Sequence, residues 1–444
     1  MSLTILSELI GLPMKELTIF LTIISHIFFS FVYRYLPVNK NSKNFNKQVK
    51  LRQLYGMVIG MGFNFLLFQW TEIVVVLISL ISFYIMAVNC TTARRAFFFS
   101  FLAIVFLCMI HVNRIMHFYR ENRFDINYVM TVIVPKQIYF NWYVFDFYQE
   151  QQKKGGKKEE SIPSFFDYSC YTLNYIGTLV TPVYSYREYD RFIKQDYEKS
   201  EFSYKLIWTK VKEFVLSLGL FFAISMYTDT DLVEKDQFSK QSVVKQIIHI
   251  CVQCLFVRCR FYIVWVLADI ITITCNFRDE THNYTSFITT IDPYQTEFAP
   301  TIKGRIDNWN ISIVKWLRLC FFDRLKTHTQ LSTGLISSLV FFISAFWHGL
   351  YPVYYITFLL GFLSLQMGKL HFKYKSVLWP GCFLIERLYM NISMITFMRH
   401  ETDRMIRVLW NFLPYLTFLF LYHFLLIMYT KRVKKRKRNK EKAD

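Results

Sequence analysis

Residues 344–358 read SAFWHGLYPVYYITF and place a single histidine, His348, between two apolar runs. The two runs form a region long enough to cross a bilayer twice, since one helical crossing needs about 20 apolar residues. Burying an ionisable group at membrane depth is costly, and an imidazole accepts a proton near neutral pH. His348 is therefore a candidate functional residue. The alternative is a core histidine that hydrogen-bonds to a neighbouring helix.

Apolar runs recur along the whole chain, from residues 17–33 to residues 409–429, and 53% of all residues are hydrophobic. They predict an all-α, polytopic integral membrane protein of about ten transmembrane helices. Residues 168–183 are one of the expected spans. The first run lacks a basic leader and a small-residue cleavage site, so we expect a retained span and not a signal peptide.

The formal net charge is +20, and the lysines and arginines gather in the breaks between apolar runs. This distribution fits the positive-inside rule and anionic lipid headgroups, and it does not imply nucleic acid. We expect one membrane domain over residues 1–430 and a basic cytosolic tail over residues 431–444. The chain ends Lys-x-Lys-x-x from Lys440, a pattern typical of retrieval to the endoplasmic reticulum, and this predicts residence in that membrane.

Several residues inside apolar runs are expected to have structural roles. The nine cysteines are scattered, so neither a disulfide framework nor a zinc site is indicated. Gly56 and Gly60 share one helical face, which permits close packing. Asp269, Arg258 and Arg260 lie in one apolar run and predict a buried pair or a water-lined cavity, because lone charges in lipid are disfavoured.

A second polar stretch, residues 307–312 (DNWNIS), follows the long polar connection at residues 278–303. Trp309-Asn310 and Trp347-His348-Gly349, separated by one apolar span, together resemble the signature of the membrane-bound O-acyltransferase family. The likeness covers about residues 163–366, including a tyrosine-rich block at residues 163–189.

Within that family, residues 309–318 are similar to the pattern of the lysophospholipid acyltransferase branch. Residues 291–298 and Arg305 look most like the lysophosphatidylinositol acyltransferases. Thr181, Asp269 and Val353 depart from the family pattern. These departures put local helix packing and the shape of the acyl-chain site in doubt.

The resemblance implies a central substrate tunnel and transfer of an acyl group from acyl-CoA to the sn-2 hydroxyl of a lysophospholipid, with lysophosphatidylinositol favoured and a polyunsaturated acyl donor. His348 is the predicted general base. Asn310 is predicted to donate a hydrogen bond to the oxyanion or to orient the acceptor. An apolar tunnel excludes water that would hydrolyse the thioester. Acyl-CoA is then a co-substrate, no permanently bound cofactor or metal is expected, and the partners are membrane lipids.

Further residues are weaker candidates for the same site. The predicted tunnel residues are Trp309, Trp347, Tyr355, Tyr262, Asp292 and Glu297. The predicted contacts to the phosphates of acyl-CoA are Arg305, Lys315 and Arg318. Ordinary headgroup contact at the membrane interface is the alternative for each of these three cations.

Other functions fit parts of the pattern. A related enzyme acting on another lysolipid headgroup, or on a protein hydroxyl, would carry the same residues. A proton-coupled transporter would also be polytopic and basic, with His348 as its proton relay. The hydropathy shows no internal repeat, which argues against a transporter. The sequence implies no particular oligomeric state.

Overall fold

The computed structural model describes residues 14–119, 125–154, 161–179, 182–196, 202–229, 231–280, 286–373 and 375–440. These residues are almost entirely helical, and the only β-pairing among them is an isolated antiparallel bridge between Arg278 and Phe287. The all-α prediction is therefore confirmed. By packing, the chain divides into two compact units that alternate along the sequence.

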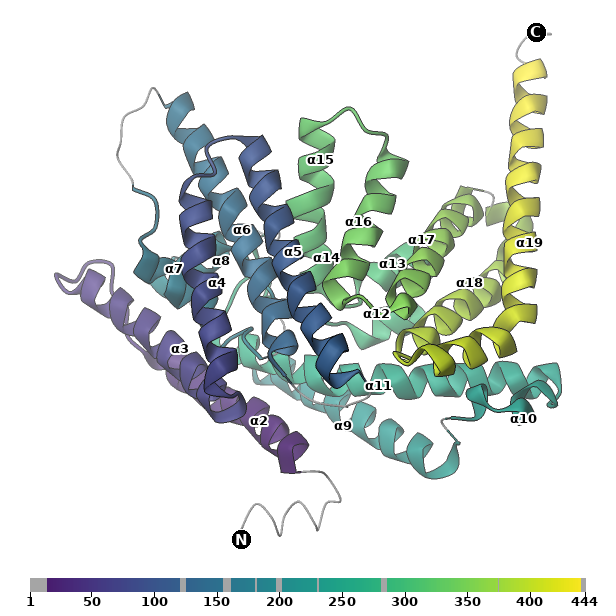
Figure 1. The fold of residues 1–444 in the computed structure, drawn as a ribbon, viewed down its shortest axis with the longest axis horizontal. Helices are drawn as coiled ribbons and strands as arrows, with labels where there is room; N and C mark the ends of the chain where they lie inside the picture. Colours follow the sequence, from purple (N-terminus) through teal and green to yellow (C-terminus); the bar gives the residue numbers. More distant parts are fainter. Residues whose placement is uncertain are drawn as a thin grey trace. The chain divides into compact units, whose positions relative to one another are not determined.

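The first unit comprises Met1–Val215, Tyr262–Asp292 and Asn310–Leu331. Its helices α4, α5 and α6 pack side by side, and α3 packs against α2, α7 and α8 (Figure 1). The elements of this unit are α2 (Met14–Tyr35), α3 (Phe45–Leu67), α4 (Trp70–Val88), α5 (Ala93–Phe118), α6 (Ile126–Lys153), α7 (Phe165–Thr172), α8 (Tyr186–Lys194), α14 (Ile311–Leu317), the π-helical segment η3 (Arg318–Phe322) and α15 (Asp323–His328). Helices α9 (Tyr204–Tyr227) and α11 (Val243–Cys275) contribute residues to both units.

Reciprocal caps fix where two short helices of this unit begin. At α7, the Ser164 hydroxyl accepts the N–H of Asp167 (3.2 Å), and the Asp167 carboxylate accepts the N–H of Ser164 (3.0 Å). Ser185 and Glu188 make the same exchange at α8, at 3.2 and 2.8 Å. Each pair satisfies two donors that the first turn would otherwise leave open.

The expected span at residues 168–183 is wrong. Helix α7 ends at Thr172, and the chain continues through a turn in which Gly177 has a φ of +69°. A side chain at that position would be strained, so the glycine permits the turn. The tyrosines around it are buried against protein, and their composition resembles that of a lipid-facing helix although they do not form one.

Gly56 and Gly60 of α3 provide the surface against which this turn packs. The N–H of Tyr175 donates to the carbonyl of Gly56 (3.1 Å). A Cβ atom on Gly60 would lie 2.0 Å from the carbonyl oxygen of Leu173. The prediction that these glycines serve close packing is confirmed, with a loop as the partner of the helix.

The second unit comprises Leu216–Phe261, Pro293–Trp309 and Ser332–Asp444. Helices α16, α17 and α18 follow one another and pack in sequence, and α19 packs against α17 and α18 (Figure 1). Buried apolar residues of α18 and α19, including Ile392 and Phe412, belong to its core. The elements are η1 (Leu232–Glu234), α10 (Asp236–Ser239), α12 (Pro293–Phe298), α13 (Ile302–Asp307), α16 (Thr333–His348), α17 (Pro352–Lys373), α18 (Lys375–Phe397) and α19 (Thr402–Lys440).

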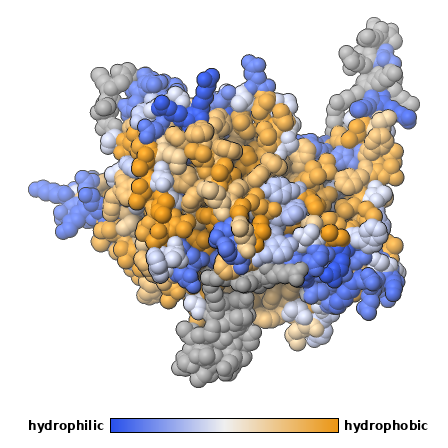
Figure 2. All heavy atoms as spheres, in the orientation of Figure 1, coloured by the Kyte–Doolittle hydropathy of each residue, from blue (hydrophilic) through white to orange (hydrophobic). Residues whose placement is uncertain are grey.

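Six described helices are long and apolar enough to span a membrane, so the expected number of about ten is not confirmed. They cover Leu17–Tyr35, Trp70–Val88, Ala93–Phe118, Val243–Cys275, Pro352–Phe372 and Thr402–Val433. On α4, Leu77, Ile78 and Ile85 are 39%, 53% and 57% exposed. Apolar side chains also cover much of the face shown in Figure 2. Such surfaces fit a lipid environment.

The contact at Gly60 leads to a stability prediction. Gly60→Ala places a methyl group against the Leu173 carbonyl, and overpacking of this kind costs about 1–3 kcal/mol. We expect the detergent-solubilised protein to lose its native elution profile at a lower temperature. Gly62→Ala is the matched control, because a Cβ atom there meets nothing within 4 Å. Equal thermal stability of the two variants would contradict the proposed contact.

Candidate functional site

The turn after α16 sets the backbone at His348. His348 is the last residue of the helix, and Gly349 follows with a φ of 140°, which favours glycine. The N–H of Gly349 donates to the carbonyls of Ala345 and Phe346, both at 3.1 Å, and closes the helix end. Pro352 then starts α17. The histidine thus lies at a sharp reversal between two apolar helices.

Aromatic rings border the half-buried imidazole of His348. Phe358 stacks on it with 5.1 Å between ring centroids, and Phe397 meets it edge to face at 4.9 Å. Trp347 and Tyr354 lie at 4.4 and 5.7 Å. These contacts come from α16, α17 and α18, so packing of the second unit fixes the ring. An imidazole in such surroundings can exchange a proton while being partly screened from water.

Asn310 precedes α14 in the first unit and has a left-handed backbone (φ 46°, ψ 55°). Asparagine adopts this conformation more readily than most residues. Its carbonyl accepts the N–H groups of Ile313 and Val314, whereas its side chain makes no capping hydrogen bond. Asn310 is 7% exposed, and its Oδ1 has no hydrogen-bond partner among the described residues. A buried, unsatisfied acceptor of this kind requires an explanation.

The tunnel candidates of the second unit occupy aromatic clusters. Trp309 packs edge to face on Phe261 with centroids 5.4 Å apart. Tyr355 contacts Phe346 in the same way at 5.4 Å, and Trp347 lies against His348. His348 and Asn310 belong to different units. Their joint action on one substrate stays a prediction, as does the central tunnel.

Glu297 is held by two arginines of the second unit. Arg258 donates to both of its carboxylate oxygens, at 2.6 and 2.9 Å, and Arg387 lies 3.4 Å away. Arg258 is thus paired inside its apolar helix, but its partner is Glu297 and not Asp269, so the expected pair among Arg258, Arg260 and Asp269 is wrong. Of the other tunnel candidates, Tyr262 is buried and Asp292 half-buried, and both lie in the first unit.

Lys315 lies between two carboxylates. Its Nζ is 2.5 Å from Glu188 Oε1 and 2.8 Å from Asp279 Oδ1. Burial lowers the pKa of the Lys315 ammonium, but the two carboxylates outweigh this effect and raise it. In this state the charge of Lys315 is neutralised by protein, and phosphate would have to compete with both acids.

Arg305 and Arg318 have opposite surroundings. Arg305 is 2% exposed and donates through Nε to the carbonyl of Ala299 (3.0 Å). Burial lowers the pKa of its guanidinium to about 10. The Arg318 side chain is 72% exposed, with Asp323 3.7 Å away. Contact with the phosphates of acyl-CoA stays a prediction for all three cations, and Arg318 is the most accessible of them.

Comparison with known proteins identifies the family of the chain. The model of the membrane-bound O-acyltransferase family matches residues 98–429, which include Asn310 and His348. The chain belongs to the membrane-bound O-acyltransferase family. The recognition made from the Trp-Asn and Trp-His-Gly pair is thereby confirmed.

Several curated proteins are similar to this family member. Membrane-bound glycerophospholipid O-acyltransferase 2 of Rattus norvegicus is 25% identical over 342 residues, covering 70% of this chain and 64% of the relative. Membrane-bound glycerophospholipid O-acyltransferase 1 of Homo sapiens is 24% identical over 388 residues, covering 81% and 76%. A membrane-bound acylglycerophosphatidylinositol O-acyltransferase of Xenopus laevis is 26% identical over 228 residues, covering 45% and 48%. The chain thus spans less than two thirds of the rat protein.

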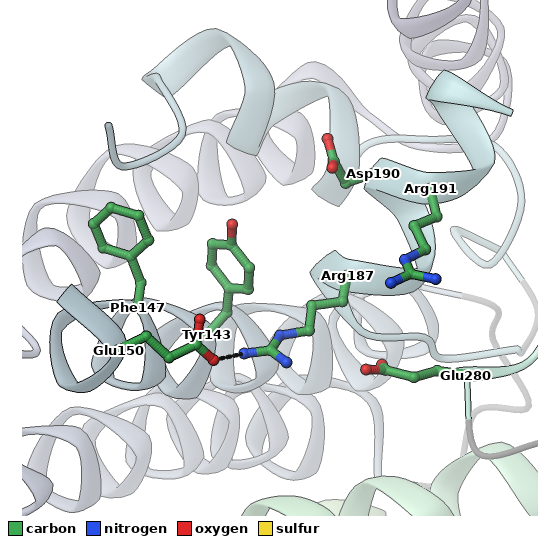
Figure 3. A pocket seen from close by; sticks show the side chains of 7 residues that line it. All are labelled: Tyr143, Phe147, Glu150, Arg187, Asp190, Arg191 and Glu280. Atoms are coloured by element: carbon green, nitrogen blue, oxygen red, sulfur yellow. Dashed lines mark hydrogen bonds and ion pairs between the residues drawn. The ribbon is translucent and has the colours of Figure 1, made fainter. Parts of the chain in front are cut away.

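The structure also contains a polar hollow that was not predicted from the sequence. It has a volume of about 220 Å³, and Arg187 donates within it to Glu150 (2.7 Å; Figure 3). Burial raises the pKa values of Asp190 and Glu280. The hollow includes none of the predicted site residues. Its lining residues are Tyr143, Phe147, Glu150, Arg187, Asp190, Arg191 and Glu280.

Within the described ranges, no group of three or more histidine, cysteine, aspartate or glutamate side chains is arranged to hold a metal ion. Cys251, one of the two cysteines with metal-like spacing, accepts a hydrogen bond from Asn391 (3.5 Å). The expectation that this acyltransferase-family protein binds no permanent cofactor stays a prediction.

The Lys315 cluster predicts a large loss of stability on substitution. Lys315→Met leaves the carboxylates of Glu188 and Asp279 facing each other without their cation, and breaking a buried pair costs about 3–5 kcal/mol. We expect a marked fall in the thermal stability of the solubilised protein. Lys194→Met is the control, because its pair with Asp190 is partly exposed and such pairs contribute at most about 1 kcal/mol. A Lys315→Met protein as stable as the control would refute the assigned pairing.

Proposed function

We propose that this protein is an acyl-CoA:lysophospholipid O-acyltransferase of the endoplasmic reticulum. It re-acylates the sn-2 hydroxyl of a lysophospholipid, with lysophosphatidylinositol as the favoured acceptor. Membership of the O-acyltransferase family and the names of the similar proteins support the reaction class. The arrangement around His348 is the single structural observation that carries the proposal.

His348 meets three requirements of a general base in this reaction. Its position at the end of α16 places an imidazole beside an apolar helix pair, where acyl chains are soluble. The rings of Phe358 and Phe397 fix the orientation of the His348 ring. Half-burial limits bulk water, which competes with the lipid hydroxyl for the thioester.

The proposed chemistry needs no covalent enzyme intermediate. The sn-2 hydroxyl gives its proton to His348 while its oxygen attacks the thioester carbonyl carbon, forming a C–O bond and an oxyanion. Collapse of the oxyanion breaks the C–S bond. The coenzyme A thiolate leaves and takes the proton from His348, so the products are the diacyl phospholipid and free coenzyme A.

The side chain of Asn310 suits an orienting role. Its unsatisfied atom is the acceptor Oδ1, which can receive a hydrogen bond from a second hydroxyl of the lysolipid, because the proton of the attacking hydroxyl goes to His348. Its Nδ2 can donate to the developing oxyanion. The first contact orients the lysolipid, so it assists the reaction even where the second is absent.

The choice of lysophosphatidylinositol rests on two observations. Residues 291–298 and Arg305 resemble the lysophosphatidylinositol acyltransferases, and the similar Xenopus laevis protein carries acylglycerophosphatidylinositol in its name. The endoplasmic reticulum is inferred from the Lys-x-Lys-x-x pattern at Lys440, and a cytosolic C-terminus from the basic tail that begins at Lys431.

Removal of the imidazole tests the catalytic proposal. General bases contribute about 10²–10⁴-fold to rate, so His348→Ala and His348→Gln are expected to lose acyl transfer by that factor. Activity is measured as labelled acyl-CoA incorporation into lysolipid in membranes carrying equal amounts of protein. His328→Ala is the control, because His328 is an exposed residue of α15. Full activity of both His348 variants would remove His348 from the mechanism.

A panel of acceptors tests the substrate. With one polyunsaturated acyl-CoA, we expect kcat/KM for lysophosphatidylinositol to exceed that for lysophosphatidylcholine, lysophosphatidylethanolamine and lysophosphatidylserine by about tenfold, or about 1.4 kcal/mol. Chain position is read by phospholipase A2 digestion of the product. Preference for another headgroup would correct the substrate, and acylation of peptide but not lipid would overturn the proposal.

A further inference from the structure

The buried carboxylate of Asp269 connects to the backbone at Asn310. Asp269 lies in the apolar helix α11 and is 0% exposed. Its Oδ1 accepts the backbone N–H of Thr290 at 2.5 Å, and its Oδ2 lies 3.2 Å from the Nζ of Lys210 in α9. Asp269 is therefore paired with Lys210 and not with Arg258 or Arg260, and Thr290 of the loop also binds its carboxylate.

The same ion pair holds the loop from a second direction. Lys210 Nζ also donates to the carbonyl of Ile291 at 3.3 Å. Asp269 thus binds the N–H of Thr290 and Lys210 binds the C=O of Ile291, so the ion pair holds the peptide groups on both sides of the Thr290–Ile291 peptide. Thr290 and Ile291 are both 0% exposed, and no water competes for these bonds.

Thr290, which Asp269 holds, also fixes the start of α14. The carbonyl of Thr290 accepts the N–H of Ile311 at 2.8 Å. Ile311 directly follows Asn310. The left-handed backbone of Asn310 determines the direction of its side-chain amide. Because the Asn310 side chain makes no capping bond of its own, the backbone on either side has to supply its orientation.

We propose that Asp269 and Lys210 are positioning residues that orient the Asn310 amide toward the acyl acceptor, acting through Thr290 and Ile311. The inference rests on the proposed function of Asn310. Its contacts all lie within the first unit: Lys210 to Asp269, Asp269 to Thr290, and Thr290 to Ile311. The ion pair does not touch the substrate, so its loss lowers turnover by misplacing Asn310.

The loop has a second anchor that does not involve this pair. Thr272 donates through Oγ1 to the carbonyl of Ile288 at 2.7 Å, and the N–H of Ile288 donates to the carbonyl of Phe277. These bonds remain when the charge of Asp269 is removed. Asp269→Asn also keeps an oxygen for the Thr290 N–H, so this variant is expected to fold with a loosened loop.

The test is a double-mutant cycle between Asp269 and Asn310 in the full-length protein in membranes. We expect Asp269→Asn to lower kcat about tenfold with the KM for acyl-CoA within about twofold, because only transition-state alignment is lost. In the Asn310→Ala background the same substitution is expected to lower kcat less than twofold, since no amide remains to be aimed. A structural defect would lower kcat equally in both backgrounds.

Three controls make the outcomes distinct. Glu213→Gln removes the other carboxylate beside Lys210 (2.9 Å), keeps both members of the Asp269–Lys210 pair, and is expected to stay within twofold of the wild type. Lys210→Gln repeats the cycle from the other side of the pair and decides the result if Asp269→Asn is not recovered. Asp269→Glu keeps the charge and is expected to restore part of kcat.

The outcomes separate this inference from the proposed function. If Asn310→Ala lowers kcat but Asp269→Asn and Lys210→Gln leave it unchanged, or lower it equally with and without Asn310, the positioning inference is overturned and the proposed function stands. If Asn310→Ala keeps wild-type kcat, the role proposed for Asn310 falls, and the inference falls with it.

Discussion

Charge burial in an apolar protein constrains this structure throughout. A lone ion far from water is destabilised by several kcal/mol, so buried cations and anions have to meet. Lys315 lies between Glu188 and Asp279, and Asp269 faces Lys210. In each case the partners come from different segments of the chain, so the pairing also determines how those segments pack.

This constraint is strongest where the backbone is irregular. The loop between α11 and α12 approaches α9 and α14 without a regular ladder of its own, and its buried peptide groups need partners. Charged side chains supply them, as Asp269 does for Thr290. The buried amine of Lys136 also stabilises the tyrosine-rich turn by donating to the carbonyls of Thr172 and Ile176, and burial lowers the pKa of this amine. Charge burial and loop folding therefore depend on each other.

The sequence was sufficient for the helical class, the family and the packing role of Gly56 and Gly60, because these depend on composition and local spacing. It was insufficient for residues 168–183, since apolar residues buried in protein and apolar residues facing lipid have the same composition. The sequence also could not identify the partners of buried charges. A charge in an apolar run requires a counterion, but nothing near Asp269 in the sequence indicates that it pairs with Lys210. Lys315 shows the converse, because its two carboxylates become neighbours only in the folded chain. The catalytic roles of His348 and Asn310 stay predictions.

The length of α19 has a mechanical consequence. Its 39 residues extend about 58 Å at 1.5 Å per residue, almost twice the roughly 30 Å thickness of a hydrocarbon layer. The last turns begin near Lys431 and Arg432, whose side chains are exposed. Cations resist being drawn into hydrocarbon, so in a bilayer these turns oppose inward movement of the helix. Helices α17 and α18 pack on α19, so the depth of α19 also sets the depth of the aromatic rings around His348.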